Sequence, residues 1–305
     1  MAKIKSQIEV IKSFILNDNF ERLFEFINPN SYFLNFYSNK FLYKNNILSS
    51  IGSINKSFKV LKYNSINDIC FFKVMTTSIL NINIITLNSS KSLEYLYFVF
   101  SKNSKKIDFI ISKEEFPNLY SKFEEKSNTL NFNTINLSFK DNLEKASPFR
   151  SILKSESPSH KTFSKSNAIA YAEKYALVHN TSYISFDNNG GDCTNFASQI
   201  LHAGGLPKTK AWYNYSNPWV RVKELRNYLI NNNLAKEFND LDSDCEGALI
   251  QFFNPELKDW THTGFITYSL GDDYLYCCHS YDKLNYPLSL AYPLIYKKIR
   301  ILKIK

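Results

Sequence analysis

The chain has 305 residues, of which 44% are apolar and 16% aromatic, so it can bury a sizeable core and is longer than one typical small domain. Its formal net charge of +9 favours anionic partners, which include nucleic acid, an acidic membrane surface and an anionic polymer such as a cell wall. The lysines are scattered through a sequence rich in Asn and Ile and do not cluster, so we predict no nucleic-acid partner.

The sequence also limits where the protein acts. No stretch approaches the roughly 18 consecutive apolar residues of a membrane span, and the N-terminus lacks the apolar core and cleavage site of a signal peptide. We therefore expect a soluble protein with no membrane span, either cytoplasmic or released by lysis or a non-classical secretion route. The five cysteines form no C-x-x-C pair, so we predict no disulfide framework, no metal site and no cofactor.

The first half of the chain changes its pattern once. Residues 1–28 place apolar side chains at helical spacing, which predicts two consecutive amphipathic helices. Five β-rich runs with short polar turns follow, at 57–63, 68–74, 80–87, 93–100 and 106–112. Strands this close together indicate an antiparallel sheet. We predict an α+β N-terminal domain over residues 1–150, cystatin-like or NTF2-like, with a binding or regulatory role.

Residues 151–166 are rich in Ser and Lys and poor in apolar residues, which predicts a linker. The domain after it, residues 167–305, opens with three expected helices, at 168–179, from Cys193 to the Gly204-Gly205 pair, and at 220–230. Four expected strands follow, at 248–253, 263–268, 274–279 and 296–304. Helices followed by antiparallel strands again indicate an α+β domain.

Cys193 lies where a thiol can become reactive, directly after a glycine-rich turn and at the start of a helix. Unpaired N–H groups and the helix dipole stabilise a thiolate at such an end. Gly190 and Gly191 remove side-chain bulk there, which lets a substrate approach and leaves backbone N–H groups for an oxyanion. A small buried cysteine in a first helical turn is the alternative interpretation.

A cysteine hydrolase also needs a base. Of the five histidines, His160 lies in the expected linker, His179 ends a helix, and His202 lies too far along the Cys193 helix. His262 and His279 remain, one at the start of a strand and the other at the end of the next. A hairpin between these strands would bring the two side by side.

The block G-G-D-C-T-N-F-A-S-Q-I-L-H-A-G-G resembles the putative amidase domain of Gram-positive bacteria, as do the later W-Y, P-W-V, W-T-H-T-G-F-I-T and C-H-S-Y-D. That family is similar to the papain-like cysteine hydrolases of the CHAP and NlpC/P60 type. The resemblance covers about residues 165–295 and implies a papain-like domain with helices packed on an antiparallel sheet. It implies Cys193 as nucleophile and His262 as base, with a polar residue of the following strand orienting His262.

The resemblance implies further roles. His279 falls where relatives place the orienting residue, and Asp282 is the alternative. Asp192 matches an acidic residue that helps to hold a substrate amino group in NlpC/P60 enzymes. Trp212 either lines a sugar-stacking groove with its aromatic neighbours or belongs to the core, and both interpretations stay open.

The main functional hypothesis is a cysteine amidase or peptidase that cleaves an amide bond in peptidoglycan. A papain-like protease or deamidase that acts on a protein partner is the second hypothesis. The third is a catalytically inactive binding module, in which Cys193 would have an ordinary thiol pKa and His262 would lie out of hydrogen-bond reach.

Overall fold

The structure, a computed structural model, describes residues 2–82, 90–102, 104–144, 163–187, 189–241, 244–271 and 273–305. The chain divides into two compact units. The N-terminal unit consists of Met1–Ser89, Leu93–Ser147 and Pro255–Leu257, and the C-terminal unit of Ser90–Ser92, Pro148–Asn254 and Lys258–Lys305. Most of the predicted linker lies outside the described residues, and its last two positions, Lys165 and Ser166, belong to a helix.

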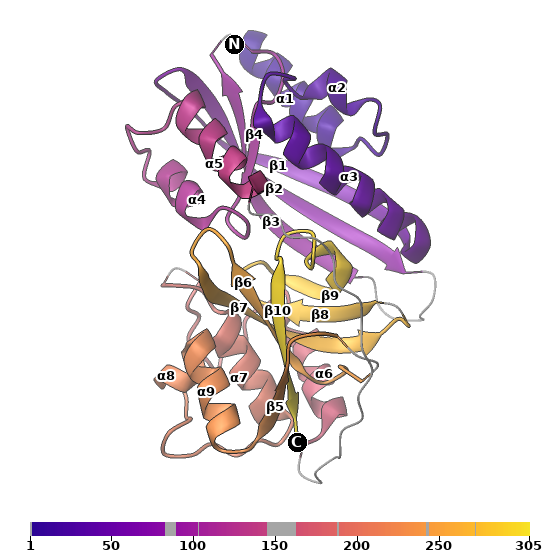
Figure 1. Ribbon diagram of the computed structural model, residues 1–305, viewed down its shortest axis with the longest axis vertical. Helices are drawn as coiled ribbons and strands as arrows, with labels where there is room; N and C mark the ends of the chain where they lie inside the picture. Colours follow the sequence, from indigo (N-terminus) through magenta and orange to yellow (C-terminus); the bar gives the residue numbers. More distant parts are fainter. Residues whose placement is uncertain are drawn as a thin grey trace. The chain divides into compact units, whose positions relative to one another are not determined.

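The N-terminal unit packs helices against antiparallel strand pairs (Figure 1). Its helices are α1 (Ala2–Ile15), α2 (Leu23–Phe26), α3 (Tyr32–Ile51), α4 (Pro117–Glu124) and α5 (Phe132–Glu144). Its strands are β1 (Gly52–Ile66), β2 (Ile69–Ile82), β3 (Ser90–Ser101, from Leu93 on) and β4 (Phe109–Ser112), in the order β1-β2-β3 with β4 beside β3. The α+β class predicted for this region is confirmed.

The expected third strand, residues 80–87, is not separate from the second. β2 pairs with β1 from Ile69 opposite Ile66 as far as Ile82 opposite Gly52. Residues 80–82 therefore continue β2, and 83–87 lie outside the described residues. No Gly, Pro, Asn or Asp lies between positions 74 and 80, so the sequence offers no strong stop for this strand.

The prediction of two helices omitted α3, α4 and α5. The sequence of α3 is rich in Asn, Ser and Tyr, which have low helix propensity. Tertiary packing compensates for this low propensity, because Phe33, Phe41 and Leu48 are buried along one side of α3. With 20 residues α3 is the longest described helix, and no helix of the described residues is long and apolar enough to cross a membrane.

The core of the N-terminal unit is built from phenylalanine rings. Phe139 of α5 contacts Phe33 and Phe36 of α3, with ring centroids 5.4 and 5.2 Å apart, and Phe109 of β4 at 5.4 Å. Edge-to-face and offset pairs of this kind add to the free energy gained from apolar burial. They fix α5 between α3 and the sheet.

The C-terminal unit is also α+β, as predicted. Its helices are α6 (Lys165–Tyr175), α7 (Cys193–Ala203), α8 (Asn217–Val220), α9 (Val222–Asn231) and the 3₁₀ helix η1 (Leu288–Leu290). Its strands are β5 (Ala235–Phe238), β6 (Leu249–Asn254), β7 (Asp259–Ser269), β8 (Tyr274–Cys278), β9 (Lys283–Pro287) and β10 (Lys298–Ile304). They run in the order β9-β8-β7-β6-β10-β5, and each neighbouring pair is antiparallel.

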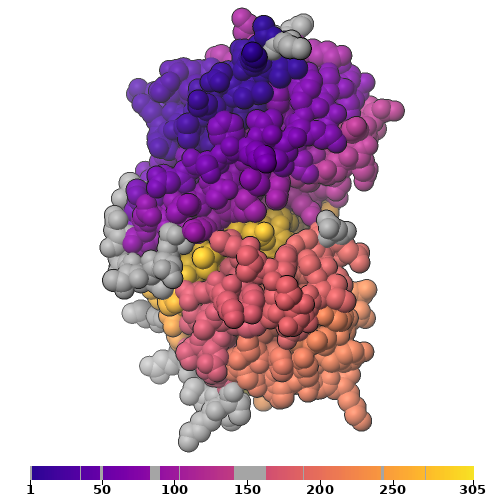
Figure 2. Space-filling model, turned by 180° about the vertical axis from the view of Figure 1, so that it is seen from behind, coloured from indigo at the N-terminus to yellow at the C-terminus, as the bar shows by residue number. Residues whose placement is uncertain are grey.

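The helices α6, α7 and α9 pack on one face of this sheet (Figure 1). Viewed from behind, the helical segments in pink to orange form this side of the unit (Figure 2). Side chains alternate along a strand, so Phe265 of β7 and Cys277 of β8 join the core under the helices, whereas Gly264 and Tyr276 face the other side. This alternation decides which of the site residues can meet.

Trp212 belongs to the core and not to a surface groove. It is 0% exposed, its ring lies 4.7 Å from that of Trp219, and its indole N–H donates to Ser198 Oγ at 3.3 Å. A side chain enclosed in this way cannot stack on a sugar, so the substrate-binding role predicted for Trp212 is wrong. The neighbouring Tyr213 is 53% exposed.

Replacing Trp212 by Ala should lower the free energy of unfolding of the C-terminal unit by about 3–5 kcal/mol, because it opens a cavity in the core. The matched surface change Tyr213→Ala should cost no more than about 0.5 kcal/mol. Urea denaturation followed by tryptophan fluorescence measures this unit, since Trp212, Trp219 and Trp260 all lie in it. Equal stability of the two variants would contradict the core position.

Candidate active site

The chain enters α7 through a glycine turn. Gly190 and Gly191 have φ values of 90° and 103°, a left-handed conformation that other residues adopt only with strain. A Cβ on Gly191 would come within 3.0 Å of Ser280 Oγ, and the N–H of Asp192 donates to that oxygen at 2.7 Å. The turn therefore holds Cys193 as the first residue of α7, where the backbone N–H groups have no partner within the helix.

The thiol of Cys193 lies against β7. The backbone N–H of Thr263 lies near Sγ and favours the thiolate, and Sγ lies 3.8 Å from Thr194 Oγ1. The hydroxyls of Thr194 and Thr263 are 3.2 Å apart, which ties the first turn of α7 to this strand. Cys193 is 7% exposed, and burial raises the pKa of its thiol despite the hydrogen bonds that favour the thiolate.

His262 directly precedes Thr263, so its side chain points to the opposite face of the sheet. Its ring packs there among aromatic rings, with centroids 4.7 Å from Tyr281 and 5.5 Å from Phe252. His262 is 1% exposed, and its Nε2 has no hydrogen-bond partner in the described part of the chain. Burial, and secondarily the charge of Lys283, hold the pKa of His262 well below its usual value, so the ring is neutral.

Cys193 of α7 and His262 of β7 both lie next to Thr263, but their side chains are not bonded to each other. Among the hydrogen bonds of the described residues, none joins Cys193 Sγ to the ring of His262. The backbone contact at Thr263 nevertheless brings the thiol to the peptide unit next to His262. The thiol of Cys193 and the imidazole of His262 are both neutral, and strand β7 lies between them.

His279 does not lie beside His262. It follows Cys277 by two positions and so faces the helices, where its ring stacks on Phe196 of α7 at 3.8 Å. Its Nδ1 lies 2.7 Å from Asp192 Oδ2, and its Nε2 lies 2.7 Å from the carbonyl oxygen of Tyr175. The hairpin pairs the strands as expected, but the alternation along each strand sends the two histidines to opposite faces. In this arrangement His279 does not orient His262.

The two predicted aspartates also lie on the helix side. Asp192 is 0% exposed and accepts hydrogen bonds from the N–H of Phe186 and from Asn195, both at 2.8 Å, besides its contact with His279. Burial opposes the charge, but these hydrogen bonds outweigh it and lower the pKa of Asp192. Asp282 is half-buried, and burial raises its pKa even though His279 lies nearby. With its carboxylate already bonded, Asp192 is not placed to hold a substrate amino group.

The other polar residues of the motif hold α7 in the core. Asn195 bonds the carbonyl of Ile184 at 2.9 Å, and Ser198 Oγ bonds the carbonyl of Trp219 at 2.9 Å. Gln199 accepts from the hydroxyl of Tyr171 at 2.9 Å. These contacts satisfy buried polar groups and fix the rotation of the helix.

Three residues of the site were not predicted from the sequence. Thr194 and Thr263 follow Cys193 and His262 directly, and that adjacency was their only signal. His179 was set aside because it ends a helix, yet its Nε2 lies 2.7 Å from Asp187 Oδ2 and its Nδ1 lies 3.5 Å from Asp192 Oδ2. Only the return of the chain between α6 and α7 brings His179 to that carboxylate.

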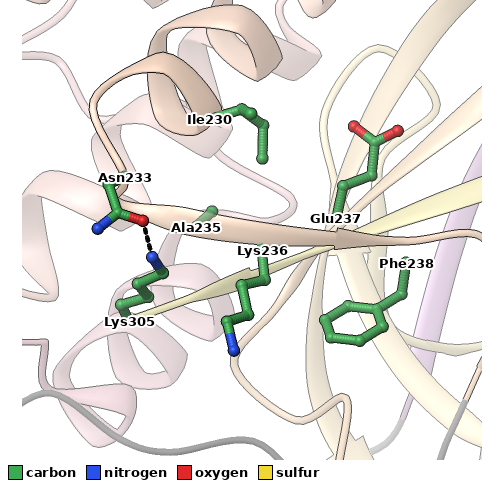
Figure 3. Close-up of a pocket in the computed structure, with 7 residues that line it drawn as sticks. All are labelled: Ile230, Asn233, Ala235, Lys236, Glu237, Phe238 and Lys305. Carbon is green, nitrogen blue, oxygen red and sulfur yellow. Dashed lines mark hydrogen bonds between the residues drawn. The ribbon is translucent and has the colours of Figure 1, made fainter.

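A pocket of the C-terminal unit lies away from this site, at strand β5 (Figure 3). It is lined by Ile230, Asn233, Ala235, Lys236, Glu237, Phe238 and Lys305. The ammonium of Lys305 donates to Asn233 Oδ1, and the lining contains no cysteine or histidine. The chemistry of the motif is therefore separate from this pocket.

Comparison with known proteins agrees with the resemblance. Residues 162–302 match the putative amidase domain family. The uncharacterized protein YjcM of Bacillus subtilis (strain 168) is 31% identical over 137 residues, which cover 42% of this chain and 33% of that protein. The uncharacterized protein YhbB of the same organism is 34% identical over 79 residues, which cover 23% of this chain and 24% of that protein. No solved structure matches the chain.

The segment that matches the putative amidase domain family therefore lies in the C-terminal half of the chain, where the sequence motif placed the resemblance. The match with the two relatives spans a third of one and a quarter of the other, so what those proteins share with this chain is confined to a segment of each.

The buried, neutral state of His262 predicts a pH-dependent stability. The unfolded histidine, with a pKa of about 6.5, binds a proton that the folded one resists. The stability from His262 is therefore fully present above pH 6.5 and decreases as the pH falls toward the lower folded pKa, by up to about 1.4 kcal/mol per pH unit. In His262→Phe this contribution is absent, so wild type should lose stability relative to the variant below pH 6.5.

Urea unfolding of both proteins between pH 5 and pH 8 measures this difference, and the shared carboxylates cancel in the comparison. Parallel stability curves for wild type and His262→Phe over that range would show that His262 is not buried in its neutral form.

Proposed function

We propose that this protein is a cysteine-dependent amide hydrolase with Cys193 as nucleophile and His262 as general base. The family match supports amide hydrolysis. The observation that carries the cysteine chemistry is the contact of Cys193 Sγ, at the first residue of α7, with the N–H of Thr263 beside His262. Papain-like chemistry requires a helix-borne thiol within reach of a strand-borne histidine, and the contact at Thr263 brings the thiol to the peptide unit next to His262.

The proposed reaction starts from the neutral pair. Sγ attacks the amide carbonyl while its proton moves to the imidazole of His262, and the N–H of Cys193 stabilises the oxyanion. The imidazolium then gives its proton to the departing amine as the C–N bond breaks. Water, deprotonated by His262, finally hydrolyses the thioester and restores the thiol.

This proposal requires a movement of the imidazole. His262 faces the aromatic side of the sheet, so its ring has to turn about its side-chain bonds toward the edge of β7 to reach Sγ. Bonds between catalytic groups often tighten only when substrate is bound. Substrate would enter over the glycine turn, because Gly190 is exposed and a Cβ there would meet no atom within 4 Å.

We propose peptide amides of bacterial peptidoglycan, in the stem peptide or at the sugar–peptide link, as the substrate. The net charge of +9 would hold the protein on an anionic cell wall. No cofactor is needed for the proposed chemistry, since the thiol, the imidazole and water supply every step.

Among the thiols of the C-terminal unit, only that of Cys193 should be needed for activity. Incubation with purified Gram-positive peptidoglycan, followed by mass spectrometry of released amines and fragments, should show a loss on the order of 10⁴-fold or more for Cys193→Ala. His262→Gln should lose about 10²- to 10⁴-fold, as expected for a general base. Cys277→Ala removes another buried thiol of the same unit and should keep the activity.

Peptidoglycan cleavage that persists in Cys193→Ala would refute the cysteine mechanism. Release from a protein substrate but not from peptidoglycan would retain the mechanism and replace the proposed substrate class.

The pH profile of kcat/KM should reveal the state of His262. The base works only when neutral, and its pKa is lowered, so the acidic limb should lie below pH 6.5. Initial rates between pH 4.5 and pH 8 measure the limb. A limb at or above pH 7 would mean that the base is not the buried His262.

A further inference from the structure

A group of three potential metal ligands lies on the helix side of the sheet. His179, Asp192 and His279 each offer one ligand atom, and these atoms all lie within 4.8 Å of one another. The residues come from three segments, the chain after α6, the residue before α7 and the end of β8. Their convergence is a product of the fold and is not visible as a sequence motif.

Both histidines have the same orientation toward Asp192. The Nε2 of His279 lies 2.7 Å from the carbonyl oxygen of Tyr175, and the Nε2 of His179 lies 2.7 Å from Asp187 Oδ2. In both rings Nδ1 is directed at Asp192 Oδ2, at 2.7 Å for His279 and 3.5 Å for His179. Metal-binding histidines almost always have such an acceptor behind the ring, because it fixes the tautomer with the other nitrogen bare.

Asp192 also has one ligand atom directed at the cluster and the other atom hydrogen-bonded elsewhere. Its Oδ1 is occupied by the N–H of Phe186 and the side-chain amide of Asn195, both at 2.8 Å. Oδ2 is the oxygen on which the two imidazoles converge. The carboxylate is 0% exposed, so its orientation is fixed by these contacts.

The two rings meet at a single oxygen. Their centroids lie 4.6 Å apart, and the Nδ1 of each is directed at Asp192 Oδ2 while its Nε2 faces a different acceptor. A cation at this point would be bound by all three groups at once.

We propose that His179 Nδ1, Asp192 Oδ2 and His279 Nδ1 bind a zinc ion. Two imidazoles and one carboxylate suit Zn²⁺. Tetrahedral bonds of about 2.0–2.2 Å place ligand atoms roughly 3.3–3.6 Å apart. The distance from His179 Nδ1 to Asp192 Oδ2, 3.5 Å, matches this separation, and the 2.7 Å between His279 Nδ1 and the same oxygen would lengthen on coordination. Because His179 is exposed, the fourth position is open to solvent.

The zinc ion would join the loop before α7 to the end of β8. It would fix Asp192, and with it the start of the helix that carries Cys193, without using the thiol. This inference is independent of the proposed hydrolase activity, because a structural ion at this point would serve a binding module equally well.

Metal binding by the full-length protein tests the inference. After removal of metal with a chelator, wild type should bind one equivalent of Zn²⁺ by titration calorimetry, and Co²⁺ should give the visible absorption of a tetrahedral site. His179→Gln changes an exposed ligand and should weaken binding by more than about 100-fold, since even outer partners of metal ligands contribute 10- to 100-fold.

Two controls make the test specific. His202→Gln alters a half-buried histidine outside the cluster and should bind Zn²⁺ like wild type. Cys193→Ala should also bind normally, and Zn²⁺ should raise the melting temperature of wild type and both controls but not of His179→Gln. Absence of binding, equal binding by His179→Gln, or loss of binding in Cys193→Ala would overturn the proposal.

Discussion

The candidate site depends on the contact between the first turn of α7 and the edge of β7. At this point β8 has ended, so the N–H of Thr263 can donate to Cys193 Sγ and not to a neighbouring strand. The hydroxyl pair of Thr194 and Thr263 fixes the same contact from the side. Because the glycine turn before Cys193 also packs on Ser280, the helix start is held from both directions. The thiol is positioned by backbone geometry, and the role proposed for it follows from that position.

The alternation of side chains along β7 and β8 then separates two environments. On the outer face His262 lies among aromatic rings, neutral and buried. On the helix face His279 meets Asp192 and His179 in a polar cluster. One side of the strand pair thus carries the histidine that we propose as base, and the other carries the polar cluster that we propose as a cation site. The motif that suggested one catalytic triad encodes two separate constellations.

Many of the helices and strands were predictable from local sequence patterns. Glycine pairs lie on both sides of α7, so its start at Cys193 and its end before Gly204 were predictable. The main strands of both units followed from their β-rich runs. The helix α3 and the short strands β5 and β9 were missed because packing, not propensity, makes them. The contacts of His279, His179 and Trp212 could not be predicted, since each depends on which face a side chain takes or on how a loop returns.

The central claim is that His262 activates Cys193. The most direct measurement is the rate at which iodoacetamide alkylates each of the five cysteines at pH 7, read by peptide mass spectrometry in wild type and in His262→Gln. The account predicts that Cys193 reacts fastest in wild type and at least about 10-fold more slowly in the variant, in line with the loss of a general base, while the other four cysteines are unchanged. Equal alkylation of Cys193 in both proteins would contradict it.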